Sequence, residues 1–321
     1  MRKIRWGVLG TAGIARWATI PGMQKAENCQ LYAIAGRSLE KARQFQQDFG
    51  FEKAYGSYEE LLNDPQVEAV YIPLPNDLHA PWSIRAMEAG KHVLCEKPLA
   101  GSEAEARRMV EAADRCGVHL MEAFAYLHNP FMDAVKQELD AGAVGDICYF
   151  ESAFIGGRTP DTDIRMYKEK YGGALYDLGC YAASMTLWMM GEPQDVRASA
   201  QFSDRGVDLF TSAVLTYANG AFASLDCGMA LPNARVDRFR VHGTRGSIVS
   251  DVRFNQSGEI AYTVTHDGET QVKTVFARDN YTLEVEQLGR CILGEEKPRV
   301  TREFSLMTAR LLDRILKEIG Y

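Results

Sequence analysis

A strand that runs directly into a glycine-rich turn is predicted by the stretch Ile4-Arg5-Trp6-Gly7-Val8-Leu9-Gly10-Thr11-Ala12-Gly13-Ile14-Ala15. Its first six residues form an apolar run typical of a buried strand, and the pattern from Ile14 to Lys25 is that of a helix interrupted near Pro21. A chain that turns sharply from a strand into a helix can present backbone N–H groups to a pyrophosphate. The stretch therefore predicts the first strand, turn and helix of an α/β domain.

Outward from this stretch, short apolar runs alternate with helical patterns as far as Met121. The predicted strands lie at 31–35, 67–72, 92–95 and 118–121, and the predicted helices at 39–49, 78–89 and 103–116. Strands that alternate with helices of about 10–15 residues need crossover connections, which build a parallel sheet covered on both faces. We therefore predict a doubly wound, dinucleotide-binding α/β domain over residues 1–122.

The pattern changes after Met121. Helical patterns at 131–141 and 173–190 flank a strand-like run at 147–154, and further strand-like runs follow at 213–217, 221–227, 238–242, 247–252, 260–265 and 271–276. Asn219-Gly220 between two of these runs is a strong hairpin signal, and consecutive strands with short turns form an antiparallel sheet. Residues 123–321 are therefore predicted to form an α+β domain on a large, mostly antiparallel sheet, with the last helices at 281–293 and 304–319 packed back on the body.

The composition excludes several classes of protein. The 321 residues include 36 Lys and Arg against 43 Asp and Glu, and the net charge of −7 provides no basic surface for nucleic acid or an anionic membrane. No run of apolar residues is long enough to predict a membrane span. Seven scattered cysteines without a C-x-x-C pair, and six histidines without H-x-x-x-H spacing, predict no metal site and reduced thiols in a cytoplasmic protein. A G-x-S-x-G nucleophile elbow is also absent, which disfavours serine hydrolysis.

The turn after the first predicted strand matches the dinucleotide fingerprint in part. Gly10 stands at the first glycine position, Ala12 with Gly13 beside it at the second, and Ala15 at the third. A glycine-rich turn can also be purely structural, but its place after the first strand of an alternating fold favours a cofactor site. The residues expected to contact the cofactor here are Gly10, Thr11, Ala12, Gly13 and Ile14.

The end of the second predicted strand favours NADP over NAD. An NAD site has Asp or Glu there to accept from the ribose 2′-hydroxyl, whereas this chain has Gly36-Arg37-Ser38, with Lys41 one turn later. A guanidinium can pair with a 2′-phosphate through two parallel hydrogen bonds. We therefore expect Arg37, Ser38 and Lys41 to bind NADP, with NAD as the alternative if Arg37 is only a solvated loop charge.

Three motifs resemble those of the Gfo/Idh/MocA oxidoreductase family, and the likeness extends over essentially the whole chain. They are Tyr71-Ile72-Pro73-Leu74-Pro75-Asn76-Asp77-Leu78-His79, then Ala89-Gly90-Lys91-His92-Val93-Leu94-Cys95-Glu96-Lys97-Pro98-Leu99-Ala100, and Gly172-Gly173-Ala174-Leu175-Tyr176-Asp177-Leu178-Gly179-Cys180-Tyr181. The resemblance implies an N-terminal Rossmann domain and a C-terminal domain for substrate binding and oligomerisation. It also implies a homodimer or homotetramer paired through the C-terminal sheet.

The same resemblance implies where the functional residues lie. It places Lys97 next to the nicotinamide and the reacting carbon, with a cis peptide before Pro98. It implies further cofactor contacts from Pro75, Asn76, His79 and Glu96.

The last position of the third motif is a tyrosine here, Tyr181, as in the sugar and dihydrodiol branch of the family; the inositol branch has histidine there. This difference favours an aldose, a keto-sugar or a cyclic diol as substrate. The segment Glu122–Tyr126 also resembles that branch, although Leu127 stands where a basic residue is more usual. Tyr126 is therefore expected to contact the substrate.

Hydride transfer to or from an alcohol carbon needs a group that gives or takes the hydroxyl proton. A free tyrosine has a pKa of about 10, and a nearby ammonium favours its phenolate. We therefore expect Tyr181 to transfer the proton and Lys97 to activate it and to donate to the substrate oxygen. Asp177, four residues before Tyr181 on the same helical face, is expected to orient the lysine or a substrate hydroxyl.

One further residue, Arg165, is a candidate for the substrate site. It precedes Gly172-Gly173 and either holds a substrate hydroxyl or pairs with Asp161 or Asp163. The full set of substrate-binding candidates is Lys97, Tyr126, Arg165, Asp177 and Tyr181.

Together these features predict an NADP-dependent dehydrogenase or reductase that acts on a CH–OH or C=O group of a sugar, keto-sugar or cyclic diol. An NAD-dependent glycosidase of the same fold is one alternative, and a non-catalytic dinucleotide sensor is another. A sensor has no need of a proton-transfer pair, so the presence of Lys97, Asp177 and Tyr181 argues against it.

Overall fold

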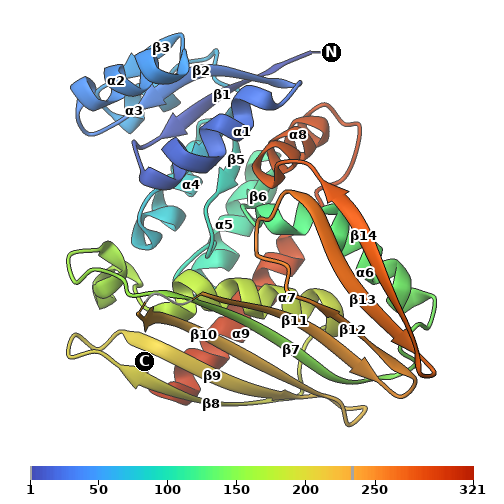
Figure 1. Ribbon diagram of the computed structural model, residues 1–321. Coiled ribbons are helices and arrows are strands. Elements are labelled where there is room, and N and C mark those ends of the chain that lie inside the picture. Colours follow the sequence, from blue (N-terminus) through green and yellow to red (C-terminus); the bar gives the residue numbers. More distant parts are fainter. Residues whose placement is uncertain (1, 233–234) are drawn as a thin grey trace. The chain divides into compact units, whose positions relative to one another are not determined.

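The computed structural model describes residues 2–232 and 235–321, which form two compact units (Figure 1). The first unit contains the chain up to His128 together with Arg278–Leu306, and the second contains Asn129–Ala277 and Met307–Tyr321. The chain therefore passes between the units three times. The helix Asn280–Ile292 (α8) belongs to the first unit, although it follows the strands of the second unit in the sequence.

The first unit is built on a six-stranded sheet with the order β3-β2-β1-β4-β5-β6, and every pair in it is parallel. The strands are β1 (Ile4–Leu9), β2 (Cys29–Ala35), β3 (Lys53–Tyr55), β4 (Ala69–Ile72), β5 (His92–Cys95) and β6 (Leu120–Glu122). The strand order reverses between β1 and β4, where such sheets bind ligands beyond their carboxyl ends. The predicted doubly wound parallel sheet is confirmed.

Helices connect these strands. They are a π-helix at Ala15–Thr19 followed by α1 (Ile20–Lys25), then α2 (Leu39–Phe49), α3 (Tyr58–Leu62), α4 (His79–Glu88) and α5 (Glu103–Cys116). The first helical stretch was expected to be interrupted near Pro21, but Pro21 lies in the first turn of α1 and the irregular π-helical turn precedes it. Serines Ser38, Ser57 and Ser102 cap α2, α3 and α5, because each side chain accepts from the backbone N–H three residues later.

The second unit is built on an eight-stranded sheet with the order β14-β13-β12-β11-β7-β10-β9-β8. The strands are β7 (Ile147–Gly157), β8 (Asp195–Phe202), β9 (Asp208–Thr216), β10 (Phe222–Leu231), β11 (Val236–Gly243), β12 (Gly246–Ser250), β13 (Gly258–His266) and β14 (Glu269–Ala277). Among the described strand pairs of this eight-stranded sheet, only β7–β10 is parallel, so the predicted large, mostly antiparallel sheet is confirmed.

The second unit contains α6 (Pro130–Asp140), a π-helix at Leu175–Gly179, and α7 (Cys180–Met190). The motif that begins at Gly172-Gly173 covers the π-helix and the start of α7. The helix α9 (Arg302–Ile319) begins in the first unit and continues in the second. The π-helix and α7 pack on β7 and β10, and nearly all of α7 is buried.

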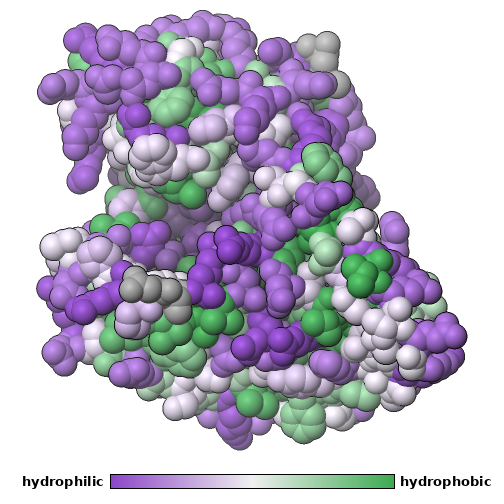
Figure 2. All heavy atoms as spheres, viewed as in Figure 1, coloured by the Kyte–Doolittle hydropathy of each residue, from purple (hydrophilic) through white to green (hydrophobic). Residues whose placement is uncertain are grey.

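One face of the molecule is drawn in Figure 2. Hydrophilic side chains cover most of this face, with smaller apolar areas between them. None of the helices in the part of the chain that the structure describes is both long enough and apolar enough to cross a membrane.

Candidate active site

The glycine-rich turn lies at the carboxyl end of β1, in the first unit. Gly10 has φ near 120°, a conformation that favours glycine, and its N–H donates to the Ala35 carbonyl at 2.8 Å. An added Cβ at Gly10 would also lie 3.0 Å from the Leu74 side chain. Thr11 and Ala12 are half-buried, while Gly13 and Ile14 are exposed at the entry to the π-helix, where a phosphate could reach their backbone N–H groups.

The residues after β2 lie beside this turn. A Cβ on Gly36 would touch the Thr11 methyl at 3.4 Å, so the turns after β1 and β2 are neighbours. Arg37 is exposed, and the Ser38 hydroxyl accepts from the Lys41 N–H at 3.4 Å, which fixes the start of α2. Burial raises the pKa of Tyr58, and the charge of Arg37 acts in the opposite direction. Arg37 therefore places a positive charge near Tyr58 and next to Gly36, whose turn neighbours the turn after β1.

The loop after β4 holds Pro75 and Asn76, both half-buried, and ends at His79. His79 is fully buried, and its two ring nitrogens lie 2.8 Å from the carbonyl oxygens of Leu74 and Pro98. Burial lowers the pKa of His79, and the hydrogen bonds to the two carbonyls oppose this shift. The His79 ring thus links the loop after β4 to the loop after β5.

The loop after β5 carries Lys97, which is half-buried, and the peptide between Lys97 and Pro98 is cis, as the family resemblance implies. Glu96, before it, is buried and accepts from the Tyr71 hydroxyl at 2.6 Å, while Thr19 donates to that hydroxyl at 2.9 Å. The Lys97 N–H donates to the other Glu96 oxygen at 3.3 Å. The Glu96 carboxylate therefore holds the backbone of Lys97 in place.

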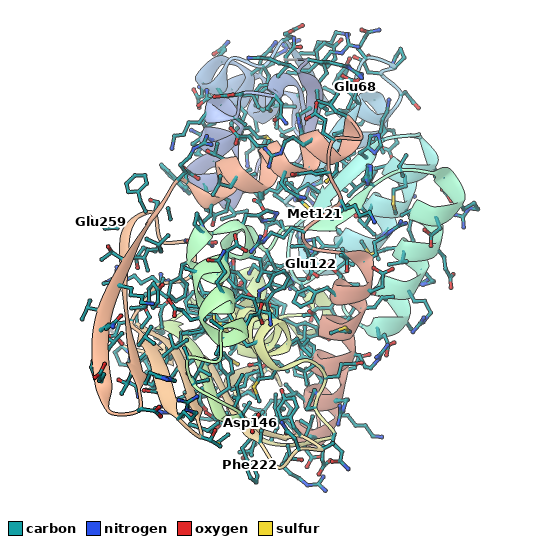
Figure 3. All side chains as sticks on the ribbon, turned by 90° about the vertical axis from the view of Figure 1, so that its right-hand side faces the viewer. Glu68, Met121, Glu122, Asp146, Phe222 and Glu259 are labelled. Atoms are coloured by element: carbon teal, nitrogen blue, oxygen red, sulfur yellow. The ribbon has the colours of Figure 1, made fainter. Side chains whose placement is uncertain are left out.

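A second buried carboxyl on this side, Glu122, has no role in the sequence prediction. It ends β6 and is labelled in Figure 3, where it lies beside the start of α9. Its side chain accepts from the Leu99 N–H at 2.7 Å. Burial raises the pKa of Glu122 to about 7, although hydrogen bonds from Ser305 and Leu99 and the charge of Lys97 oppose the shift. A carboxyl residue at the carboxyl end of a buried parallel strand is the signal that could have identified it.

Tyr126, a predicted substrate contact, lies in the short 3-10 turn Ala125–His128 of the first unit. Only 3% of it is exposed, and its ring stands edge-on to Phe124 with the centroids 6.0 Å apart. Tyr126 is thus almost fully buried.

In the second unit the structure brings Arg165 and Asp177 together. The Arg165 Nε lies 2.7 Å from Asp177 Oδ2, and its Nη1 lies 3.1 Å from Asp163 Oδ1. Of the two aspartates expected as partners, Asp161 and Asp163, the structure pairs Arg165 with Asp163. Arg165 also pairs with Asp177, which was not among its expected partners. The charge of Asp177 is the main factor that raises the pKa of Arg165, so the guanidinium stays charged.

Tyr181 lies in the first turn of α7, four residues after Asp177. It is 8% exposed, and its ring packs against Phe154 and Phe254 with centroids 5.4 Å and 5.2 Å away. These rings fix the orientation of the phenol ring from two sides. Arg165, Asp177 and Tyr181 thus lie in the second unit, and the glycine turn, Arg37 and Lys97 lie in the first.

Within residues 2–232 and 235–321, no three His, Cys, Asp or Glu side chains are arranged to hold a metal ion.

Both units match models of known protein families. Residues 4–124 match the oxidoreductase family with an NAD-binding Rossmann fold, and residues 132–249 match the GFO/IDH/MocA C-terminal domain. The chain is 39% identical over 315 residues to D-xylose 1-dehydrogenase (NADP(+)) 2 of Haloferax volcanii, covering 97% of this chain and 95% of that protein. It is 31% identical to the trans-1,2-dihydrobenzene-1,2-diol dehydrogenase of Xenopus laevis, with 98% of both chains covered.

A solved structure is similar over the same length. KijD10, a 3-ketoreductase from Actinomadura kijaniata solved in complex with NADP and TDP-benzene, matches with a TM-score of 0.91 and 32% identity over 99% of this chain and 98% of that one. Both family matches and these full-length similarities agree with the six-stranded and eight-stranded sheets. The chain therefore belongs to the GFO/IDH/MocA family of oxidoreductases.

Proposed function

We propose that this protein is an NADP-dependent dehydrogenase or reductase that acts on a CH–OH or C=O group of a sugar, a keto-sugar or a related cyclic diol. The observation that carries the proposal is the exposed Arg37 beside the glycine turn, at the switch point of a sheet shared with a reductase solved with NADP. By their names, two of the similar proteins act on xylose and on a dihydrobenzenediol, and the third is a 3-ketoreductase. Xylose and the dihydrobenzenediol both carry adjacent hydroxyl groups.

The first unit would hold the cofactor. The backbone N–H groups from Gly10 to Ile14 would bind the pyrophosphate, and Arg37, with Ser38 and Lys41 nearby, would bind the 2′-phosphate. Pro75, Asn76 and Lys97 would lie along the nicotinamide half, because they follow β4 and β5 at the carboxyl edge of the same sheet. The bound nicotinamide supplies or accepts the hydride.

The side chains of the second unit would transfer the proton to or from the substrate oxygen. Tyr181 would give its phenolic proton to the substrate oxygen during reduction or accept the hydroxyl proton during oxidation. The Lys97 ammonium would stabilise the phenolate and donate to the same oxygen. The ion pair between Asp177 and Arg165 would orient the substrate hydroxyls on the same face of the helix.

The open face of the second sheet supports a homodimer or homotetramer. Along β9 and β10, alternate residues point away from α7, and Val214 and Phe222 on that face are 46% and 50% exposed. Figure 3 labels Phe222 at the start of β10. We propose that copies of the chain pair through this face. We also infer a reducing compartment such as the cytoplasm, because all seven cysteines are free thiols.

The test is a spectrophotometric screen of aldoses, keto-sugars and cyclic diols with NADP and NAD. The proposal predicts a net change in NADPH that is stoichiometric with substrate consumed. A cofactor that stays bound while a glycosidic bond is cleaved, with no net NADPH change, would instead support a glycosidase. Tight NADP binding with no turnover on any of these substrates would support a sensor.

A further inference from the structure

A buried carboxylate in the second unit lies at the start of the helix that carries Asp177 and Tyr181. Asp208 is the first residue of β9 and has no exposed surface. Its Oδ2 accepts from the backbone N–H of Leu175 at 2.8 Å and from the Thr211 hydroxyl at 2.7 Å. Leu175 opens the π-helix that continues into α7, so the carboxylate binds one of the N–H groups left free at a helix start.

The turn before this helix is shaped around the same carboxylate. Gly173 has φ near 107°, and a Cβ added there would collide with Asp208 Oδ1. The N–H of Gly173 donates to the Arg165 carbonyl at 2.8 Å, and the Tyr321 hydroxyl donates to the Gly172 carbonyl at 2.8 Å. The two glycines are thus held from one side by Asp208 and from the other by Arg165 and Tyr321.

This arrangement fixes the angular position of the next six residues. From a helix start held at Leu175, Asp177 faces Arg165 and Tyr181 follows one turn later. Gly179 lies between them, packed so closely on β10 that an added Cβ would lie 2.8 Å from the Cys227 Sγ. A small rotation at Leu175 would therefore displace both Asp177 and Tyr181, and misplacement of a reacting group by about 1 Å can cost about 100-fold in rate.

We propose that Asp208 is a positioning residue for catalysis: it holds the start of the helix at Leu175 and thereby sets the placement of Asp177 and Tyr181, without touching substrate or cofactor. The inference rests on the proposed function, because it assigns Asp208 to the proton-transfer group described there. Burial raises the pKa of Asp208, and the hydrogen bonds from Thr211 and Leu175 oppose this shift. The contribution specific to this site is that the carboxylate comes from a distant strand and so couples the helix to the sheet.

The experiment uses the geometry of the two hydrogen bonds, which share one oxygen. Asp208→Asn retains an acceptor at that position, Asp208→Ala removes it, and Asp208→Glu keeps the charge but shifts the oxygens by a methylene. For Asp208→Ala and Asp208→Glu we expect kcat to fall by about 10–100-fold with an unchanged dissociation constant for NADP, and for Asp208→Asn to remain within about threefold of wild type. If Asp208→Ala does not fold, Asp208→Glu gives the same test.

Thr211→Val is the matched control. It removes the other partner of the same oxygen and leaves the Leu175 bond, so kcat should stay near the wild-type value. The proposal is overturned if Asp208→Ala or Asp208→Glu keeps wild-type kcat, or if Asp208→Asn is as impaired as Asp208→Ala.

Amide hydrogen exchange separates this inference from the proposed function. The amides of residues 174–181 should exchange faster in Asp208→Ala and Asp208→Glu and as in wild type in Asp208→Asn. Unchanged exchange in all three variants would overturn the positioning role. Wild-type enzyme that transfers no hydride in the substrate screen would overturn the proposed function alone, since the exchange measurement does not depend on turnover.

Discussion

The guanidinium of Arg165 lies 2.7 Å from the carboxylate of Asp177, and the same side chain reaches Asp163. Arg165 stands in a short 3-10 turn, and Asp177 lies in the π-helix that follows Gly172-Gly173. The two glycines allow this return, because a Cβ on Gly172 would collide with the Arg165 carbonyl oxygen. Gly172-Gly173 therefore allows the chain to turn back, and the ion pair with Asp177 then holds Arg165 against the π-helix Leu175–Gly179.

Arg165→Ala should lower kcat/KM for the substrate by about 10–100-fold, because a charge-assisted hydrogen bond contributes about 1.5–3 kcal/mol. The affinity for NADP should not change, because the proposed cofactor contacts lie in the first unit. Steady-state kinetics and NADPH fluorescence titration measure the two quantities. Asp163→Asn is the control: it leaves the pair with Asp177 in place and should reduce kcat/KM much less. Equal losses in both variants would show that the pair with Asp177 has no special role.

Tyr181→Phe should reduce kcat by about two or more orders of magnitude, because the substrate oxygen then loses its proton donor. The ring would keep its packing against Phe154 and Phe254, so stability and NADP affinity should stay close to wild type. Turnover, thermal unfolding and NADP titration check the three expectations. Wild-type turnover in Tyr181→Phe would remove the phenol from the mechanism.

Arg37→Asp should reverse the cofactor preference. An aspartate at the end of β2 repels a 2′-phosphate and can accept from the 2′-hydroxyl of NAD. The ratio of kcat/KM for NADP over NAD should fall by about 100-fold or more, most of it through KM for NADP. Lys41→Ala, at a second cation near the same ribose position, is expected to change the ratio in the same direction but less. A parallel loss with both cofactors would contradict the assignment of Arg37 to the 2′-phosphate.

The elements that the sequence predicts best are those with a strong burial pattern. β1 and β5 are buried along nearly their whole length, and the apolar runs at 4–9 and 92–95 match their bounds. β3 and β8 are absent from the sequence prediction. β3 has only three residues, none of them buried, and is too short to show a pattern. β8 does alternate, with Val196, Ala198, Ala200 and Phe202 between polar residues, although Val196 alone is buried in this edge strand.

The sequence motifs identify candidate site residues, but the contacts between them depend on the fold. Both π-helices, Ala15–Thr19 and Leu175–Gly179, look like ordinary helix in the sequence, although each lies within or next to a glycine motif. Such π turns occur frequently at functional sites. The bond of His79 to Pro98 joins two different motifs, and that of Asp208 to Leu175 joins a strand to the start of the motif helix, over 19 and 33 residues of sequence. Spacing within one motif gives no information on such contacts.

Glu122→Gln should remove a pH dependence of stability. Burial raises the pKa of Glu122 from 4.5 to about 7, so the folded protein binds this proton more tightly than the unfolded chain does. Wild-type stability should therefore fall as the pH rises from about 4.5 to about 7, by up to about 3 kcal/mol, and then level off. Gln keeps an acceptor for the Leu99 N–H and has no proton to lose. Urea unfolding at pH 5 and pH 8 should show the variant gaining on wild type only at the higher pH.

Glu284→Met should stabilise the protein. Glu284 lies fully buried on α8, and neither carboxyl oxygen has a hydrogen-bond partner among the residues that the structure describes. Burial, with the charges of Glu96 and Asp279, raises the pKa of Glu284 well above its usual value, so the folded protein holds this proton more tightly than the unfolded chain does. A buried polar group without a partner costs about 1–3 kcal/mol, which an apolar side chain of similar length would recover.

The gain from Glu284→Met should be larger at pH 8 than at pH 5. The unfolded chain increasingly releases the Glu284 proton as the pH rises above the ordinary pKa of 4.5, whereas the folded wild type holds the proton more tightly. Glu286→Met on the same helix is the matched control, because Glu286 accepts from Arg278 at 3.1 Å and its loss should destabilise the protein. If both variants lower the urea midpoint equally, Glu284 stabilises the fold through contacts of its own, and its description as an unpartnered buried acid is wrong.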